Sequence, residues 1–252
     1  MRVLLSAGLL ALCNGIATAA QVAVLTPSSS GIVSAEFGGT LLSAPTLGLS
    51  ELARNVGEAS RRLTDQAAAD KFDVSEEFAR AVVGALTRKQ HTAAELPIKR
   101  RERVGPLSRD EVPDHADAPL LLDIAIYYAG LYSIGQPGLY EPAVLIDYRW
   151  IDSGGSLVQS SRLIQYNKYL ERFEEPGRSR WGLPGRRSSP NVVVIPTDGS
   201  CIFRTVSAAQ EQAQKLWKCL MLAFDEVGAK IADDVPADPA APGNLRSDLG
   251  SH

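Results

Sequence analysis

Histidine is the side chain best suited to acid–base catalysis near neutral pH, and the sequence contains 3 of them. Because His252 falls in a tail whose composition predicts disorder, a Ser-His-Asp site would have to use His91 or His115. His115 stands between Asp114 and Asp117, and two carboxylates that flank an imidazole could hold a divalent cation or form an acid–base pair. The sequence identifies no third partner for either use, and a solvated acidic turn explains the same residues.

The chain lacks the short motifs that place a nucleophile, a metal or a nucleotide. It contains no Gly-x-Ser-x-Gly or Ser-x-x-Lys arrangement for a reactive serine. Cys-x-x-Cys, His-Glu-x-x-His, the P-loop and Gly-x-Gly-x-x-Gly are absent as well. The sequence therefore calls for no cofactor or metal and favours a non-catalytic role. The alternatives are an enzyme that uses His115 or His91, and a module that binds a small ligand or a cation.

The stretch 167–190 loses all alternation and places arginines and a tryptophan among glycines and prolines. These residues are Arg178, Arg180, Trp181, Arg186 and Arg187. The stretch is interpreted as a mobile surface loop. A contact with a partner is the alternative, because arginine and tryptophan dominate binding hot spots. A second basic stretch, Pro97–Val104, lacks aromatic residues and is interpreted as a solvated edge strand or loop.

The amino terminus has the three parts of a secretory signal peptide. Arg2 gives a minimal positive region, Val3–Leu12 is apolar apart from Ser6, and Ala17–Ala19 offers small residues for a signal peptidase. We expect residues 1–19 to be removed by cleavage after Ala19 or Ala20. A buried amino-terminal helix is the alternative. A transmembrane anchor is not expected, because the apolar run is shorter than the roughly 20 residues of a membrane span.

Cys13 raises the alternative of a bacterial lipoprotein. Leu12 precedes it, however, where lipid modification requires a small residue. The sequence therefore predicts a soluble protein, periplasmic or secreted, with no transmembrane segment after cleavage.

Cleavage would leave Cys201 and Cys219, and an even number of cysteines in an oxidising compartment predicts a disulfide. Two separately buried thiols are the alternative. With a helix that begins at Ser207, Cys219 lies about 18 Å along the axis. The preceding chain reaches back about 20 Å when it is extended. If the helix began at Val206 or earlier, this geometry would put the bond out of reach.

Composition places the chain among ordinary globular proteins, with 45% hydrophobic and 22% charged residues. The formal charge of −3 gives no electrostatic reason to expect nucleic acid as a partner. The length fits one well-buried domain, which we place at residues 20–235, followed by a disordered tail at 236–252.

Three runs at the centre of the chain alternate apolar and polar residues with the period of a β-strand. They are 120–129, 143–151 and 157–166. In the first run, one parity carries Leu120, Leu122, Ile124, Ile126 and Tyr128, which predicts that these side chains share a face. Glycines and serines at 152–156 favour a short hairpin loop, so the runs predict an antiparallel meander with a half-exposed third strand.

Helices and further strands are expected on both sides of the meander. Strands are expected at 21–26 and at 192–195. The second is expected to be central in the sheet because it is wholly apolar, and 28–50 is interpreted as a long loop. Helices are expected after Ser50 and after an Asp73 cap. The longest helix is expected to begin at Thr205 or Ser207 and to reach Ile231, with Trp217 and Met221 widening its apolar face.

These elements predict an α/β or α+β fold, in which a mixed sheet with a central antiparallel meander is covered by amphipathic helices. Their order resembles small periplasmic α/β domains of bacterial envelope-assembly proteins, such as CsgG, PelC and the amino-terminal domain of TolB. The resemblance rests on the strands at 22–26, 121–129, 143–151 and 157–166 and on the helices from Glu51 and Ser207. It implies a non-catalytic exported protein that binds another envelope protein in assembly, secretion or transport, and a homo-oligomer remains open.

Overall fold

The computed structural model describes residues 21–29, 33–36, 49–100, 104–113, 118–133, 139–167, 192–197 and 199–236. For 33–36, 49–57 and 59 it describes the backbone alone. The expected signal peptide and all but the first residue of the expected tail lie outside these ranges.

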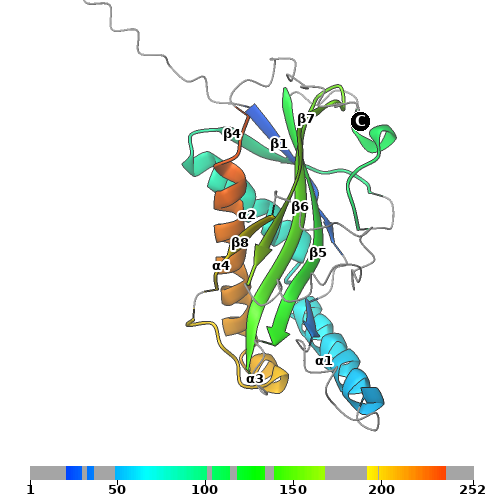
Figure 1. Ribbon diagram of the computed structural model, residues 1–252, viewed down its shortest axis with the longest axis vertical. Coiled ribbons are helices and arrows are strands. Elements are labelled where there is room, and N and C mark those ends of the chain that lie inside the picture. Colours follow the sequence, from blue (N-terminus) through cyan, green and yellow to red (C-terminus); the bar gives the residue numbers. More distant parts are fainter. Residues whose placement is uncertain are drawn as a thin grey trace, which may run out of the picture.

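An eight-stranded mixed sheet forms the centre of the molecule, with the order β4-β1-β5-β6-β7-β8 (Figure 1). The strands are β1 (Gln21–Leu25), β2 (Ser28–Ser29), β3 (Val33–Glu36), β4 (Thr92–Leu96), β5 (Leu120–Ser133), β6 (Tyr140–Asp152), β7 (Leu157–Tyr166) and β8 (Val192–Ile195). β5, β6 and β7 pair antiparallel, which confirms the predicted meander. The remaining strands join it in parallel, with β1, β2 and β3 following one another along β5.

The hairpin between β6 and β7 turns where its glycines and serines predicted. Gly155 adopts a φ of +76°, a conformation that costs glycine little because it has no Cβ. The Asp152 carboxylate accepts a 2.7 Å hydrogen bond from the Ser156 amide and so closes the loop.

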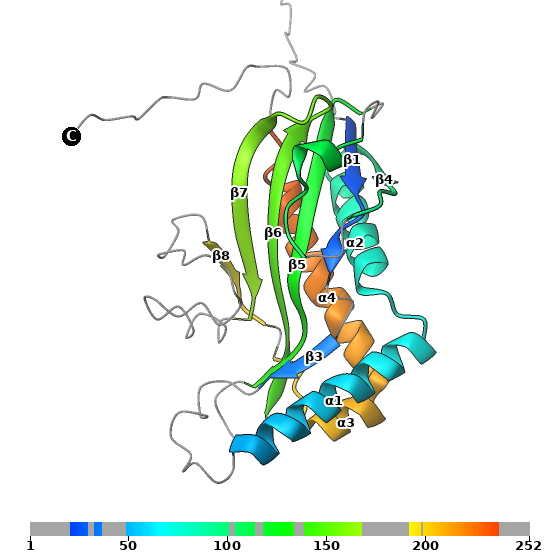
Figure 2. The same ribbon diagram turned by 90° about the vertical axis from the view of Figure 1, so that its right-hand side faces the viewer.

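Amphipathic helices cover one face of this sheet, as predicted. The helices are α1 (Leu49–Ala69), α2 (Val74–Arg88), α3 (Val206–Glu211) and α4 (Ala213–Ala232). Figure 2 shows α2 and α4 packed against the same face. The core between them includes Phe78 and Phe224, whose rings meet edge to face with centroids 5.2 Å apart. Asp73 caps α2 by accepting hydrogen bonds from the amides of Ser75 and Glu76.

A β-bulge in β5 divides the predicted alternation into two registers. The pairing of β5 with β6 shifts between Ile126 and Tyr128. Before the shift Leu120, Leu122, Ile124 and Ile126 face the helices as expected. After it Ala129 and Leu131 do so, while Tyr128 joins Tyr132, Ala143 and Leu145 on the opposite face. The prediction was therefore wrong for Tyr128, because an extra residue reverses every later side chain.

Several predicted elements take another place or form. β8 is half-buried and ends the described sheet, so the prediction of a central strand was wrong. Residues 28–50, interpreted as one loop, contain β2 and β3. The outer strand β4 was not predicted, and α1 begins at Leu49, so Ser50 lies inside it.

The last helix is not continuous, which corrects the expectation of one helix from Thr205 or Ser207 to Ile231. It breaks at Gln212, whose φ of −110° and ψ of 37° lie outside the helical region. α3 and α4 therefore run in different directions, as Figure 1 shows. No helix among the described residues is long and apolar enough to cross a membrane.

Candidate functional site

The corner between α1 and α2 positions one aromatic side chain against α4. α1 ends in a Schellman motif, in which the Phe72 amide donates to the Ala67 carbonyl and the Lys71 amide to the Ala68 carbonyl. Lys71 takes the left-handed position of this motif with a φ of 56°, where glycine is the usual residue. The tight turn brings Phe72 back toward the start of α4.

Phe72 stacks on Trp217 of α4, with ring centroids 4.7 Å apart and an interplanar angle of 15°. The indole Nε1 of Trp217 donates a 2.7 Å hydrogen bond to Oδ2 of Asp70. This hydrogen bond, with a second one from Gln66, holds the pKa of the Asp70 carboxyl below its ordinary value. The ring of Trp217 is thus held on its face by Phe72 and at its polar edge by Asp70.

An open groove of about 560 Å³ runs beside this pair, between the α1–α2 corner and the outer side of α4. Its lining consists of Asp70, Lys71, Phe72, Glu77, Gln214, Trp217, Lys218, Met221, Leu222 and Asp225. Leu222 is 46% exposed, and Met221 is half-buried next to it. We call these ten residues the Trp217 groove.

The Trp217 groove carries charges of both signs. Glu77 pairs with Arg80 and Asp225 with Arg88, while Asp70 accepts from the neutral indole of Trp217 and keeps its negative charge. Lys71 and Lys218, in contrast, form no ion pair with any residue whose side chain the structure describes. Exposed apolar atoms beside two ammonium groups that have no ion pair in the described part of the chain suit an amphipathic segment that carries carboxylates.

A second polar cluster lies on the opposite face of the sheet and centres on Asp123, which is 1% exposed. Its Oδ1 accepts a 2.7 Å bond from Nη2 of Arg100, and its Oδ2 accepts 2.9 Å bonds from Nε of Arg149 and the Leu107 amide. Arg149 also donates to the Leu107 carbonyl. Both oxygens are therefore occupied, and the carboxylate fastens the segment around Leu107 to the sheet.

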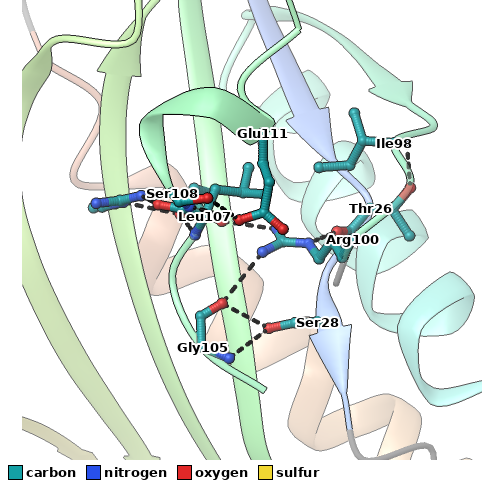
Figure 3. Close-up of polar contacts among 10 residues, drawn as sticks. Thr26, Ser28, Ile98, Arg100, Gly105, Leu107, Ser108 and Glu111 are labelled. Carbon is teal, nitrogen blue, oxygen red and sulfur yellow. Dashed lines mark hydrogen bonds and ion pairs between the residues drawn. The ribbon is translucent and has the colours of Figure 1, made fainter. Parts of the chain in front are cut away.

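Arg100 links this cluster to Thr26, between β1 and β2, and to Gly105, as Figure 3 shows. Its guanidinium donates to the Thr26 carbonyl at 2.5 Å and to the Gly105 carbonyl at 3.4 Å. The Ser28 hydroxyl in turn donates to Gly105. The interpretation of 97–104 as a solvated stretch was wrong for Arg100, whose side chain is only 9% exposed, because a buried carboxylate recruits it. The cluster is a structural fastening and not a reaction centre.

Cys201 and Cys219 form the expected disulfide, with Cα atoms 5.8 Å apart. The helix does begin at Val206, a start that was predicted to put the bond out of reach. That geometric condition was wrong because of the break at Gln212. Measured from Ala213, Cys219 lies only about 9 Å along α4. Because α3 is not collinear with α4, its length does not add to the distance between the two cysteines.

Of the two histidines considered for an alternative catalytic role, the structure describes only His91. His91 follows the end of α2. Its buried Nδ1 has no hydrogen-bond partner among the residues that the structure describes. Among the residues searched, no group of three or more His, Cys, Asp or Glu side chains could hold a metal ion. The Asp114–Asp117 turn with His115 lies outside the described residues, as do Arg178, Arg180, Trp181, Arg186 and Arg187.

Sequence reasoning missed the Trp217 groove although part of its signal was visible. Trp217 and Met221 widen the apolar face of the helix beyond the stripe that a sheet needs to cover. Their neighbour Phe72 comes from a turn far away in the sequence, so nothing in the periodicity predicted the stacked pair.

Comparisons with known proteins identify no family. No family model matches the chain, and no curated protein matches it. The crystal structure of protein XCC0632 from Xanthomonas campestris, family-model DUF330, is 12% identical, with a TM-score of 0.35 over 85% of this chain and 82% of that one. A putative neuraminyllactose-binding hemagglutinin homolog from Helicobacter pylori is 11% identical, with a TM-score of 0.25 over 87% of each chain. At these scores neither likeness carries a functional conclusion.

Proposed function

We propose that this chain is a non-catalytic protein, exported to the periplasm or secreted, that binds another protein of the cell envelope through the Trp217 groove. The groove carries the proposal, because Leu222 and Met221 leave apolar surface in a groove that Lys71 and Lys218 also line. The occupant that fits is an amphipathic segment of an envelope protein, with carboxylates beside its apolar face.

Export is supported by two independent features of the chain. The amino terminus has the composition of a signal peptide, and the disulfide between Cys201 and Cys219 suits an oxidising compartment. Mass spectrometry of the native protein should show a chain that starts at Ala20 or Gln21. A chain that keeps Met1, or one with lipid on Cys13, would overturn this part of the proposal.

Site-specific photocrosslinking in the intact envelope tests the groove. A benzophenone side chain at Leu222 should capture an envelope protein, and mass spectrometry should map the adduct to one segment that contains acidic residues. Leu157 offers a matched control, because it is 55% exposed and lies at the start of β7, away from the groove. Equal capture from both positions would contradict the proposal.

A charge-reversal experiment then separates a specific contact from mere proximity. Lys218→Glu should abolish the adduct from Leu222, and a Glu→Lys or Asp→Lys change in the captured segment should restore it. If the reciprocal change does not restore capture, Lys218 does not pair with a carboxylate of the captured segment.

A small apolar anion is the second candidate occupant, since a volume of about 560 Å³ falls within the range of small-molecule sites. Native mass spectrometry of protein purified without denaturant distinguishes the two. A stoichiometric small ligand that is lost in Leu222→Asp would favour this second candidate over a protein segment.

A further inference from the structure

Among the strands that the structure describes, none pairs with the outer edge of β8. On one side β8 pairs in parallel with β7, from Leu163 opposite Val192 to Tyr166 opposite Ile195. On its other side no strand in the described ranges pairs with it, and Figure 2 shows β8 beyond β7 at the end of the sheet. An open edge presents unpaired amide and carbonyl groups to any chain that approaches it.

The pairing with β7 shows which residues of β8 direct their backbone groups outward. The Asn167 amide donates a 3.0 Å hydrogen bond to the Ile195 carbonyl, so Ile195 turns toward β7. In a parallel ladder, alternate residues turn both backbone groups to the same neighbouring strand. Val193 therefore also faces β7, while Val192 and Val194 point their N–H and C=O groups to the open edge.

The side chains of β8 do not protect this edge. The strand is Val192-Val-Val-Ile195, without a charge, and its valines are half-buried. β4, at the opposite end of the sheet, carries Glu95 and is followed by Pro97, which are features that discourage strand addition. The two ends of one sheet thus differ in their protection.

We propose that the occupant of the β8 edge is a second copy of this chain, paired antiparallel across a two-fold axis. With Val193 of one copy opposite Val193 of the other, Val192 meets Val194 at both ends of the pair. These are the residues with outward backbone groups, so each Val192–Val194 pair exchanges two hydrogen bonds. The edge is therefore complementary to itself, as a two-fold interface requires, and no like charges oppose each other.

The size of the contact sets the strength that we expect. Stable protein–protein interfaces bury about 1,200–2,000 Å², and two four-residue strands cover much less than that. The pairing therefore produces a weak dimer that forms with rising protein concentration, and it does so independently of what occupies the Trp217 groove.

A cysteine crosslink tests the register. The two Val193 residues would form a non-hydrogen-bonded pair, whose Cα atoms lie about 4.5 Å apart. This distance lies within the range found in disulfides. Val193→Cys in the mature chain should form an intermolecular disulfide on oxidation, since Cys201 and Cys219 are already paired. Ala94→Cys is the matched control, because Ala94 holds the equivalent inward-facing position on edge strand β4.

Sedimentation velocity over a range of concentrations tests the backbone pairing. Val194→Pro removes an outward N–H without removing a bond to β7 and should leave a monomer, whereas Val194→Thr keeps the N–H and should dimerise like the parent. The proposal is overturned if the parent stays monomeric up to millimolar concentration or if Val194→Pro dimerises as well as Val194→Thr. It is also overturned if Val193→Cys crosslinks no better than Ala94→Cys. Capture of a different protein by a photocrosslinker at Val192, with no self-adduct, would also overturn it.

Discussion

At the scale of single residues, burial decides which charged side chains hold the protein together. The carboxylate of Asp123 is 1% exposed and accepts three hydrogen bonds, two of them from guanidinium groups. Asp225 is 48% exposed and pairs with Arg88 at 3.3 Å. A buried pair that loses one partner leaves an uncompensated charge, whereas an exposed pair is screened by water.

We therefore expect Asp123→Asn to lower the free energy of unfolding by about 3–5 kcal/mol, because the amide group would face the donors of Arg100 and Arg149. Asp225→Asn serves as the control and should change it by less than about 1 kcal/mol. Chemical denaturation of the two variants and the parent measures the difference. Equal effects of the two substitutions would contradict the structural role of Asp123.

The pKa of Asp70 gives a pH prediction for the Trp217 groove. Because the folded state lowers this pKa, the hydrogen bond from Trp217 stabilises the fold above the unfolded pKa of about 3.9 and is lost as pH falls through the lower folded value. The indole N–H resonance of Trp217 should therefore move with a midpoint below the unfolded pKa of about 3.9. Trp217→Phe identifies the resonance, and a midpoint above pH 4 would contradict the assignment.

At the scale of elements, α2 and α4 approach each other closely at one glycine. A Cβ on Gly228 would lie 3.3 Å from both the Ala81 carbonyl oxygen and the Val82 Cα, which are backbone atoms that cannot move independently. A Cβ on Gly84 would meet only the end of the Arg88 side chain, at 3.5 Å. The two glycines therefore have different roles on the same pair of helices.

Gly84→Ala should raise the free energy of unfolding by about 0.5–1 kcal/mol, because alanine loses less backbone freedom in a helix. Gly228→Ala should lower the free energy of unfolding by about 1 kcal/mol, because the cost of overpacking exceeds the gain in helix propensity. Thermal and urea unfolding of the two variants measures both signs. A stabilising Gly228→Ala would show that the helices can separate at no cost.

At the scale of the whole molecule, contacts at both ends fasten α4 to the rest of the fold. Near its start, the disulfide links Cys219 to Cys201. After its end, Asp234 accepts hydrogen bonds from Tyr148 of β6 and from Gln159 and Arg162 of β7. Burial, together with the bond to Asp234, raises the pKa of Tyr148, so its hydroxyl stays a donor throughout the physiological range.

Removal of the disulfide by Cys201→Ser with Cys219→Ser should cost about 3 kcal/mol in the chain-entropy model, for a sequence separation of 18. Unfolding of the double variant and of the oxidised parent gives this difference. Thiol counting in denaturant, without reductant, provides the control. Two free thiols in protein isolated from its native compartment would contradict the bond.

The elements of the fold were largely determined by local sequence. The runs at 120–129, 143–151 and 157–166 predicted the meander because alternation reports which face of a strand is buried. Asp73 predicted the start of α2, since a cap acts through the nearest amides. The apolar face expected on the helix that reaches Ile231 became the buried face of α4, which includes Leu216, Leu220, Phe224 and Val227.

Only the tertiary structure decided how distant segments meet. The bulge after Ile126 that turns Tyr128 away, the edge position of β8 and the break at Gln212 that brings Cys201 to Cys219 depend on neighbouring strands and helices. The burial of Arg100 depends on Asp123, and the Trp217 groove depends on a turn at Lys71. Periodicity reports that a side chain is buried and does not report its partner, because partners are set by the packing of the whole chain.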